Sequence, residues 1–232
     1  MVALAFARPL GAAAPPGPTD TAAAGEQARA GSAIAGALDD SFGSPLAFDR
    51  LGELQPDLAQ AILAAWRRAQ ADGQSEAVFR HAVLGLVRAR MVRAALVGDG
   101  AELDDVQRIR LGLLRRARAA GGDTCTAYLR TGELPLGIDP PDALRAREQA
   151  LARRMLGAGL LGPLRGLDAR RATIPGEIVS AVTAGTGLSQ QTVRAAFQDQ
   201  GSADDRCSVT IGLLEATLTW NGPERRDILL TL

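Results

Sequence analysis

The stretch from Ile178 to Phe197 holds the side chains whose types and spacing come closest to a recognisable chemistry, the reading of DNA bases. Ser189 is placed to cap a helix, because its side-chain oxygen can accept a hydrogen bond from a first-turn N–H group. Gln190, Gln191 and Arg194 follow it and would point outward. Amide and guanidinium groups pair with base edges and phosphates in the major groove. These four polar residues are therefore a candidate nucleic-acid site.

A helix–turn–helix would have to position these side chains, and the residues around the turn fit one. Gly187 suits a left-handed turn, and Leu188 and Val193 supply apolar residues that would face a core. Any tight corner between two packed helices satisfies the same pattern. Gly185 interrupts the first helix, and Asp199 follows the second, where its charge would repel phosphates. The pattern predicts a helix–turn–helix corner and favours a structural role over the reading of DNA.

Cys125 and Cys207 are the two cysteines of the chain, and they are not part of a CxxC pair. Because His81 is the only histidine, a zinc site is disfavoured. In an oxidising compartment the two cysteines would form one disulfide, which closes a loop of about 80 residues and contributes about 4 kcal/mol in the chain-entropy model. In a reducing cytosol both would be ordinary buried thiols. We predict the bridge, which would hold two helices together.

Arginine supplies every basic side chain, a composition typical of a GC-rich bacterial genome. Between residues 142 and 171, seven arginines stand against three acidic residues. Such a region could recognise an anion through the planar guanidinium group. Arginine near the end of a helix is also what the helix macrodipole favours. We favour this structural explanation of the cluster.

Residues suited to catalysis do not come together in the sequence. The neighbouring carboxylates Asp39–Asp40, Asp104–Asp105 and Asp204–Asp205 would point apart on a helix, so none forms a facing acid–base pair. His81 lies in a very apolar helical stretch, which favours a structural imidazole over a general base. The sequence also lacks a G-x-S-x-G turn and a glycine-rich phosphate loop. It predicts a protein that is not an enzyme, with no catalytic, cofactor-binding or metal-binding residues.

The elements that carry these residues follow a helical period. Of the 232 residues, 47% are hydrophobic and only 3% are aromatic, so a core must be built mainly from Leu, Val, Ile and Ala. Apolar residues recur at spacings of three and four, and no strand-like alternation is present. We predict an all-α fold, an irregular multi-helix bundle of roughly eight helices. The expected helical segments are 56–72, 75–97, 104–118, 125–129, 139–156, 178–197 (as a pair), 203–220 and 224–232.

The N-terminal part differs in composition from the rest. Residues 1–44 are rich in Ala, Pro and Gly, which predicts a flexible, weakly ordered tail or linker. Residues 21–38 within it could form an Ala-rich helix, but most of its apolar groups are methyl groups, so we expect it to bury little. Residues 45–232 are predicted to form a single helical domain.

Cellular location is indicated only by indirect signs. The sequence has no apolar run of about 18 residues, so we expect no transmembrane segment. Residues 1–14 resemble either the remnant of an export signal or a disordered tail. The formal net charge is zero, which provides no general attraction to nucleic acid or acidic lipid. Together with the predicted disulfide, these observations favour the periplasm or cell envelope over the cytoplasm.

Two functional hypotheses follow. The first is a non-enzymatic, all-helical interaction or scaffold protein, exported to the cell envelope, held by one disulfide and working with a protein partner. The second is a cytoplasmic helix-turn-helix regulator that binds DNA through residues 178–200. The first is favoured, because the acidic residues around the second helix oppose nucleic-acid binding.

Overall fold

The computed structural model describes residues 29–39, 48–97, 101–157 and 173–231, and the statements below refer to these residues. All regular secondary structure within them is helical, which confirms the all-α prediction. Residues 29–39 form a first helix, and ten labelled helices follow it, so the described part of the chain holds more than the roughly eight expected from periodicity. The labelled helices are α2 (Phe48–Leu54), α3 (Pro56–Ala71), α4 (Glu76–Val97), α5 (Ala101–Ala119), α6 (Gly122–Thr131), α7 (Asp142–Gly157), α8 (Gly176–Thr186), α9 (Gln190–Phe197), α10 (Ala203–Thr219) and α11 (Arg225–Thr231).

Several helix ends lie where local sequence signals place them. Pro56 opens α3, where its missing N–H group costs no helical hydrogen bond. Gly132 and Gly187 follow α6 and α8 with φ of 72° and 70°, a left-handed conformation that glycine adopts without strain. The Ser202 side chain accepts a hydrogen bond from the backbone N–H of Asp205 at the start of α10. Local capping therefore accounts for the bounds of these helices.

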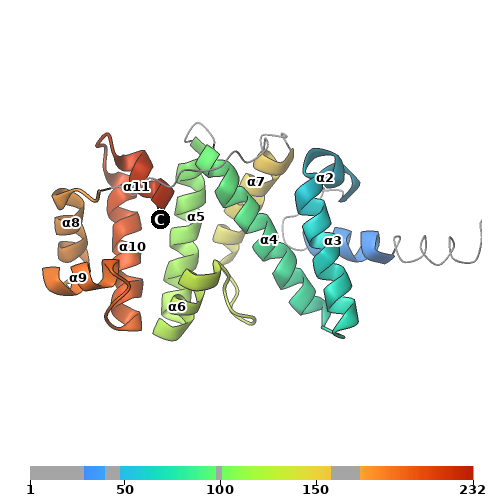
Figure 1. The fold of residues 1–232 in the computed structure, drawn as a ribbon, viewed down its shortest axis with the longest axis horizontal. Coiled ribbons are helices and arrows are strands. Elements are labelled where there is room, and N and C mark those ends of the chain that lie inside the picture. The colour runs from blue at the N-terminus through green and yellow to red at the C-terminus, as the bar shows by residue number, and fades with distance from the viewer. Residues whose placement is uncertain (1–28, 40–47, 98–100, 158–172, 232) are drawn as a thin grey trace, which may run out of the picture.

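The helices stand side by side in an elongated row, as Figure 1 shows, with α2 and α3 toward one end and α8 and α9 at the other. Most contacts join helices that are neighbours in sequence. The main exception is α10, which packs against both α5 and α6 from much earlier in the chain. Through these contacts with α5 and α6, α10 connects the C-terminal helices to the rest of the row.

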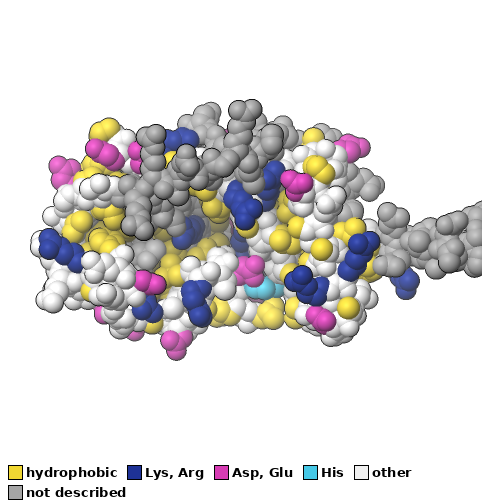
Figure 2. Space-filling view, viewed as in Figure 1, with side chains coloured by type: hydrophobic (Ala, Val, Ile, Leu, Met, Phe, Trp, Pro, Cys, Tyr) yellow, Lys and Arg dark blue, Asp and Glu magenta, His cyan; other side chains and the backbone are white. Residues whose placement is uncertain are grey.

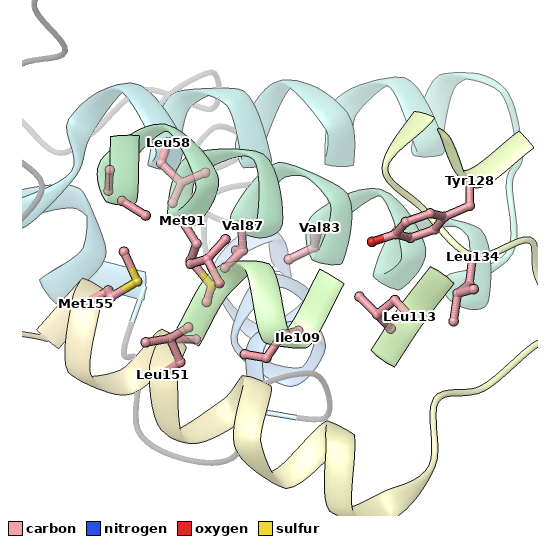
Figure 3. Close-up of a cluster of buried hydrophobic side chains, with 14 of the residues drawn as sticks. Leu58, Val83, Val87, Met91, Ile109, Leu113, Tyr128, Leu134, Leu151 and Met155 are labelled. Atoms are coloured by element: carbon pink, nitrogen blue, oxygen red, sulfur yellow. The ribbon is translucent and has the colours of Figure 1, made fainter. Parts of the chain in front are cut away.

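Two hydrophobic clusters make up the core. The larger one draws on residues 29–39 and on helices α2 to α7, and Figure 3 shows a part of it between α3, α4, α5, α6 and α7. The smaller one lies between α8, α9, α10 and α11. Helix α10 contributes to both, since Ile211 and Leu214 belong to the larger cluster and Val209 and Leu213 to the smaller. A helix that is apolar around much of its girth is expected at such a central position.

The predicted tail over residues 1–44 lies mostly outside the described residues, as does the proposed signal remnant at residues 1–14. Its residues 29–39 form a helix in which Ile34 and Leu38 are fully buried in the larger cluster. The expectation that this stretch buries little is therefore wrong for residues 29–39. The two large side chains are four residues apart, so they lie on the same helix face, with Ala30 and Ala37 buried beside them.

Candidate functional sites

The corner between α8 and α9 forms as its sequence pattern predicts. Gly187 ends α8, and its N–H group donates to the Thr183 carbonyl. The Ser189 hydroxyl oxygen accepts a hydrogen bond of 3.1 Å from the backbone N–H of Thr192, which caps α9. Val193 is fully buried in the smaller cluster. Cap, turn and core residues together fix the direction of α9.

The outward edge of α9 carries the candidate nucleic-acid residues. Gln190, Gln191 and Arg194 are all exposed, so the structure brings them to one surface beside the capping Ser189. The Asp199 carboxylate is also exposed just beyond the end of α9, 3.7 Å from the guanidinium of Arg206. This edge therefore has polar groups of the right type, but an acidic residue lies next to them.

Cys125 of α6 and Cys207 of α10 are brought together in the larger cluster. Their Sγ atoms lie at disulfide distance, and their Cα atoms are 6.0 Å apart, within the range that a disulfide requires. Both side chains are fully buried. A bridge here would fasten α10 to α6, although the two cysteines are separated by 82 positions in the sequence.

An apolar hollow lies between α4 and α5, and we call it the α4–α5 cleft. Its volume is about 390 Å³, within the range of small-molecule sites. Its walls come from α4 and α5, its polar end is completed by α6 and by Glu148 of α7, and its other end is closed by α11. The apolar wall residues include Met91, Val92, Leu96, Val106, Ile109, Leu113, Leu129, Leu229 and Leu230.

A buried ion pair stands at the polar end of this cleft. The guanidinium of Arg88 donates two hydrogen bonds to the Glu148 carboxylate, one from Nε and one of 2.8 Å from Nη2. Burial by itself lowers the pKa of Arg88, but the hydrogen bond and charge of Glu148 outweigh this effect and raise the pKa overall. The Arg88 guanidinium therefore stays charged, and the pair joins α4 to α7.

Three more polar side chains line the α4–α5 cleft. Burial raises the pKa of Tyr128 to about 12, which keeps its hydroxyl protonated at neutral pH; Figure 3 shows its ring projecting from α6 into the core. Burial lowers the pKa of Arg110, because removal from water penalises the charged guanidinium. Gln107 donates from Nε2 to the Leu229 carbonyl at 2.7 Å, and its buried Oε1 has no partner among the described residues.

A second hollow of about 330 Å³ opens on the other side of the Arg88–Glu148 pair, and we call it the His81 hollow. His81 Nε2 lies 2.9 Å from a carboxylate oxygen of Glu133, and Figure 2 shows the histidine in cyan against an acidic side chain. A Cβ atom on Gly85 would overlap this carboxylate, so a larger residue there would displace the Glu133 side chain from its present position. Leu136, on the loop after α6, lies at the edge of the hollow with 56% of its surface exposed.

Sequence reasoning did not find these two hollows. Arg88 stands in the most apolar predicted helix, which was a usable signal for a buried partner, but Glu148 lies 60 positions away. Glu133 likewise reaches His81 from a separate loop. Pairings over such distances depend on the packing of helices, which periodicity alone does not specify.

The arginine cluster of residues 142–171 is only partly described. Arg154 pairs with Asp105 at 2.6 Å, and Arg145 lies 3.6 Å from Asp139. Because Asp105 lies on α5, Arg154 connects α7 to α5, whereas Asp139 lies on the loop just before α7. Of the other five arginines, Arg147 and Arg153 lie on α7, and those at positions 165, 170 and 171 lie outside the described residues.

In the described ranges, the structure contains no group of three or more His, Cys, Asp or Glu side chains arranged to hold a metal ion. Nor does any helix in the described part of the chain reach the length and hydrophobicity needed to cross a membrane. The candidate sites are thus an apolar cleft with a polar end, a hollow with an exposed leucine, and a polar helix edge. Comparison with protein-family models, with curated proteins and with solved structures found no match to this chain.

Proposed function

We propose that this chain is a non-enzymatic, all-helical interaction protein of the cell envelope, and that it binds a protein partner through the His81 hollow and the loop beside it. The observation that carries the proposal is the exposure of Leu136. Among the described residues, Leu136 is the large hydrophobic side chain that stays exposed, whereas the other large hydrophobic side chains are buried or half-buried. A partner that covered this side chain would remove its apolar surface from water, which favours association.

The loop that presents Leu136 has a defined conformation. The N–H group of Ile138 donates to the Pro135 carbonyl at 3.1 Å, and Gly137 between them has a φ of 85°. Pro135 and Pro140 restrict the backbone on either side. A loop that is already ordered loses less conformational entropy on binding, which supports a docking role.

The predicted location rests on the Cys125–Cys207 pair. A buried pair at disulfide distance is expected to be oxidised in a periplasm or cell envelope and reduced in a cytosol. Counting free thiols in the denatured, non-reduced protein tests this directly. We expect none, and two free thiols would contradict both the bridge and the envelope assignment.

The docking surface is tested by comparing three immobilised proteins against envelope extracts: the wild-type chain, Leu136→Ser, and Gln60→Ser as a control on the exposed face of α3. A partner retained by the wild type and by Gln60→Ser, but lost by Leu136→Ser, would then be purified and its affinity measured. We expect about a tenfold loss of affinity for Leu136→Ser, since the burial of one leucine contributes about 1.5 kcal/mol or more. Equal binding by all three proteins would refute this surface.

The alternative is a cytoplasmic DNA-binding regulator, and one observation favours it: Gln190, Gln191 and Arg194 share the exposed edge of a well-capped helix. It predicts a gel shift at low salt that Arg194→Ala and Gln191→Ala weaken. Because Asp199 lies beside this edge, we expect no such shift. A salt-sensitive shift that depends on these side chains would instead establish the regulator.

A further inference from the structure

We propose that the α4–α5 cleft binds a single-chain apolar carboxylate, such as a fatty acid, with its carboxylate at the Arg88 end and its hydrocarbon chain between α4, α5 and α11. This site is separate from the protein-docking surface at Leu136, and its existence does not depend on that function. Three features of the cleft support it: its donor groups, its length and its charge.

Hydrogen-bond donors gather at the polar end. Arg88 is only 8% exposed and has five N–H groups, of which the bonds to Glu148 use those on Nε and Nη2. The Nη1 group makes no hydrogen bond to another described residue, so it remains for an added acceptor. The Tyr128 hydroxyl, which is 3% exposed and protonated at neutral pH, lines the same end. A guanidinium with a nearby hydroxyl donor is a favourable site for a carboxylate.

The remainder of the cleft suits a narrow apolar chain. From Arg88 to Leu96 it follows α4 for eight residues, or about 12 Å at the rise of an α-helix. Along this path Val92, Val106 and Leu229 supply aliphatic walls from three helices. A volume of about 390 Å³ lies near the lower end of the range for ligand sites, which favours a single chain over a bulky ring system.

The charged residues on the cleft wall favour an amphiphile with an anionic head group over one with a cationic head group. Three arginines are among the residues that line the cleft, Arg88, Arg93 and Arg110, and the only acidic residue among the described lining residues is Glu148. Since Glu148 already receives the Arg88 hydrogen bonds, an anionic head group is attracted and a cationic one is repelled. A neutral chain would gain only the apolar contacts.

Isothermal titration calorimetry of the full, oxidised chain with dodecanoate tests the proposal, with dodecanol and dodecyltrimethylammonium as probes of the head group. We expect saturable binding of one dodecanoate, about tenfold weaker binding of dodecanol, and weaker binding still of the cation. Tyr128→Phe removes one donor without changing the ring and should weaken dodecanoate binding by about tenfold. Loss of the carboxylate preference, with dodecanol bound as well as dodecanoate, would overturn the assignment of the head group.

A steric variant locates the ligand. Ala89 is an exposed residue on the cleft wall, so Ala89→Trp should fill the cleft without removing a core side chain and should abolish binding. Ala64→Trp, at an exposed position of α3 away from the cleft, should bind dodecanoate like the wild type, and so should Leu136→Ser. Circular dichroism melting confirms that each variant is folded. No binding to the wild type, or equal binding to Ala89→Trp, would overturn the site.

Discussion

The buried ion pair between Arg88 and Glu148 places two opposite charges between two hollows, at a point where α4 meets α7. Each charge is tolerated there because the other is present, since a single buried charge is very costly. The pair therefore constrains which side chains can occupy both positions. The pair sets the register between α4 and α7 more than it adds to the net stability of the fold.

A double-variant comparison tests this role of the pair. Glu148→Leu leaves the Arg88 guanidinium buried without its partner and should lower the free energy of unfolding by about 3–5 kcal/mol. Arg88→Met combined with Glu148→Leu removes both charges and should recover most of that loss. Urea denaturation of the three proteins measures the difference. If the double variant is no more stable than Glu148→Leu, the penalty does not come from the unpaired charge.

Tyr128 is the only tyrosine of the chain, so its ionisation can be followed alone. Burial raises its pKa from 10.0 to about 12 in the folded protein, whereas the unfolded chain should titrate near 10. Between these values the unfolded state loses its proton first, so the free energy of unfolding falls as the pH rises from about 10 to 12, by about 2–3 kcal/mol in total. Absorbance of the phenolate against pH, with and without denaturant, measures both pKa values. Coincident midpoints would show that the hydroxyl is not buried.

At the scale of single helices, capping explains the order of the C-terminal part. Helix α9 has only eight residues, which is too short to be stable by itself, so its ends and its buried Val193 must hold it in place. Ser189 caps it, and α8 and α10 pack against it. The corner is thus a local structure that depends on α10 for its support.

Removal of the cap gives a measurable change. Ser189→Ala deletes the hydroxyl that accepts from the Thr192 N–H group, and the free energy of unfolding should fall by about 1 kcal/mol. Ser180→Ala, at an exposed position inside α8, is the matched control and should change stability little. Chemical denaturation of both variants provides the comparison. Equal effects at the two positions would show that the cap does not stabilise α9.

Local signals in the sequence predicted the helices but not the way in which they pack. Pro56, Gly187 and Ser189 act within a few residues of their own backbone, so the elements that they bound could be predicted. The short helical segment expected at 125–129 is instead the complete helix α6. Residues 29–39, which were expected to bury little, pack into the core. Both outcomes depend on contacts with distant helices. The two hollows escaped prediction for the same reason, because the side chains on their walls come from three or more segments.

For the molecule as a whole, the cysteine pair affects stability through the unfolded chain. A bridge across 82 positions restricts the unfolded ensemble and should contribute about 4.5 kcal/mol in the chain-entropy model. Thermal unfolding with and without a reductant should therefore show a higher midpoint for the oxidised protein. The variant Cys125→Ala with Cys207→Ala should resemble the reduced protein and be indifferent to the reductant. Identical midpoints for oxidised and reduced wild-type protein would contradict the bridge.

The same bridge has a mechanical consequence. If the oxidised chain is pulled from its two ends until it unfolds, tension along the chain passes from Cys125 directly to Cys207, and the backbone of α7, α8 and α9 between them is not stretched. The fully stretched chain would be about 280 Å shorter than its reduced form, at about 3.4 Å per residue. Stretching the oxidised chain would therefore leave this enclosed segment, with the α8–α9 corner, free of tension along its backbone.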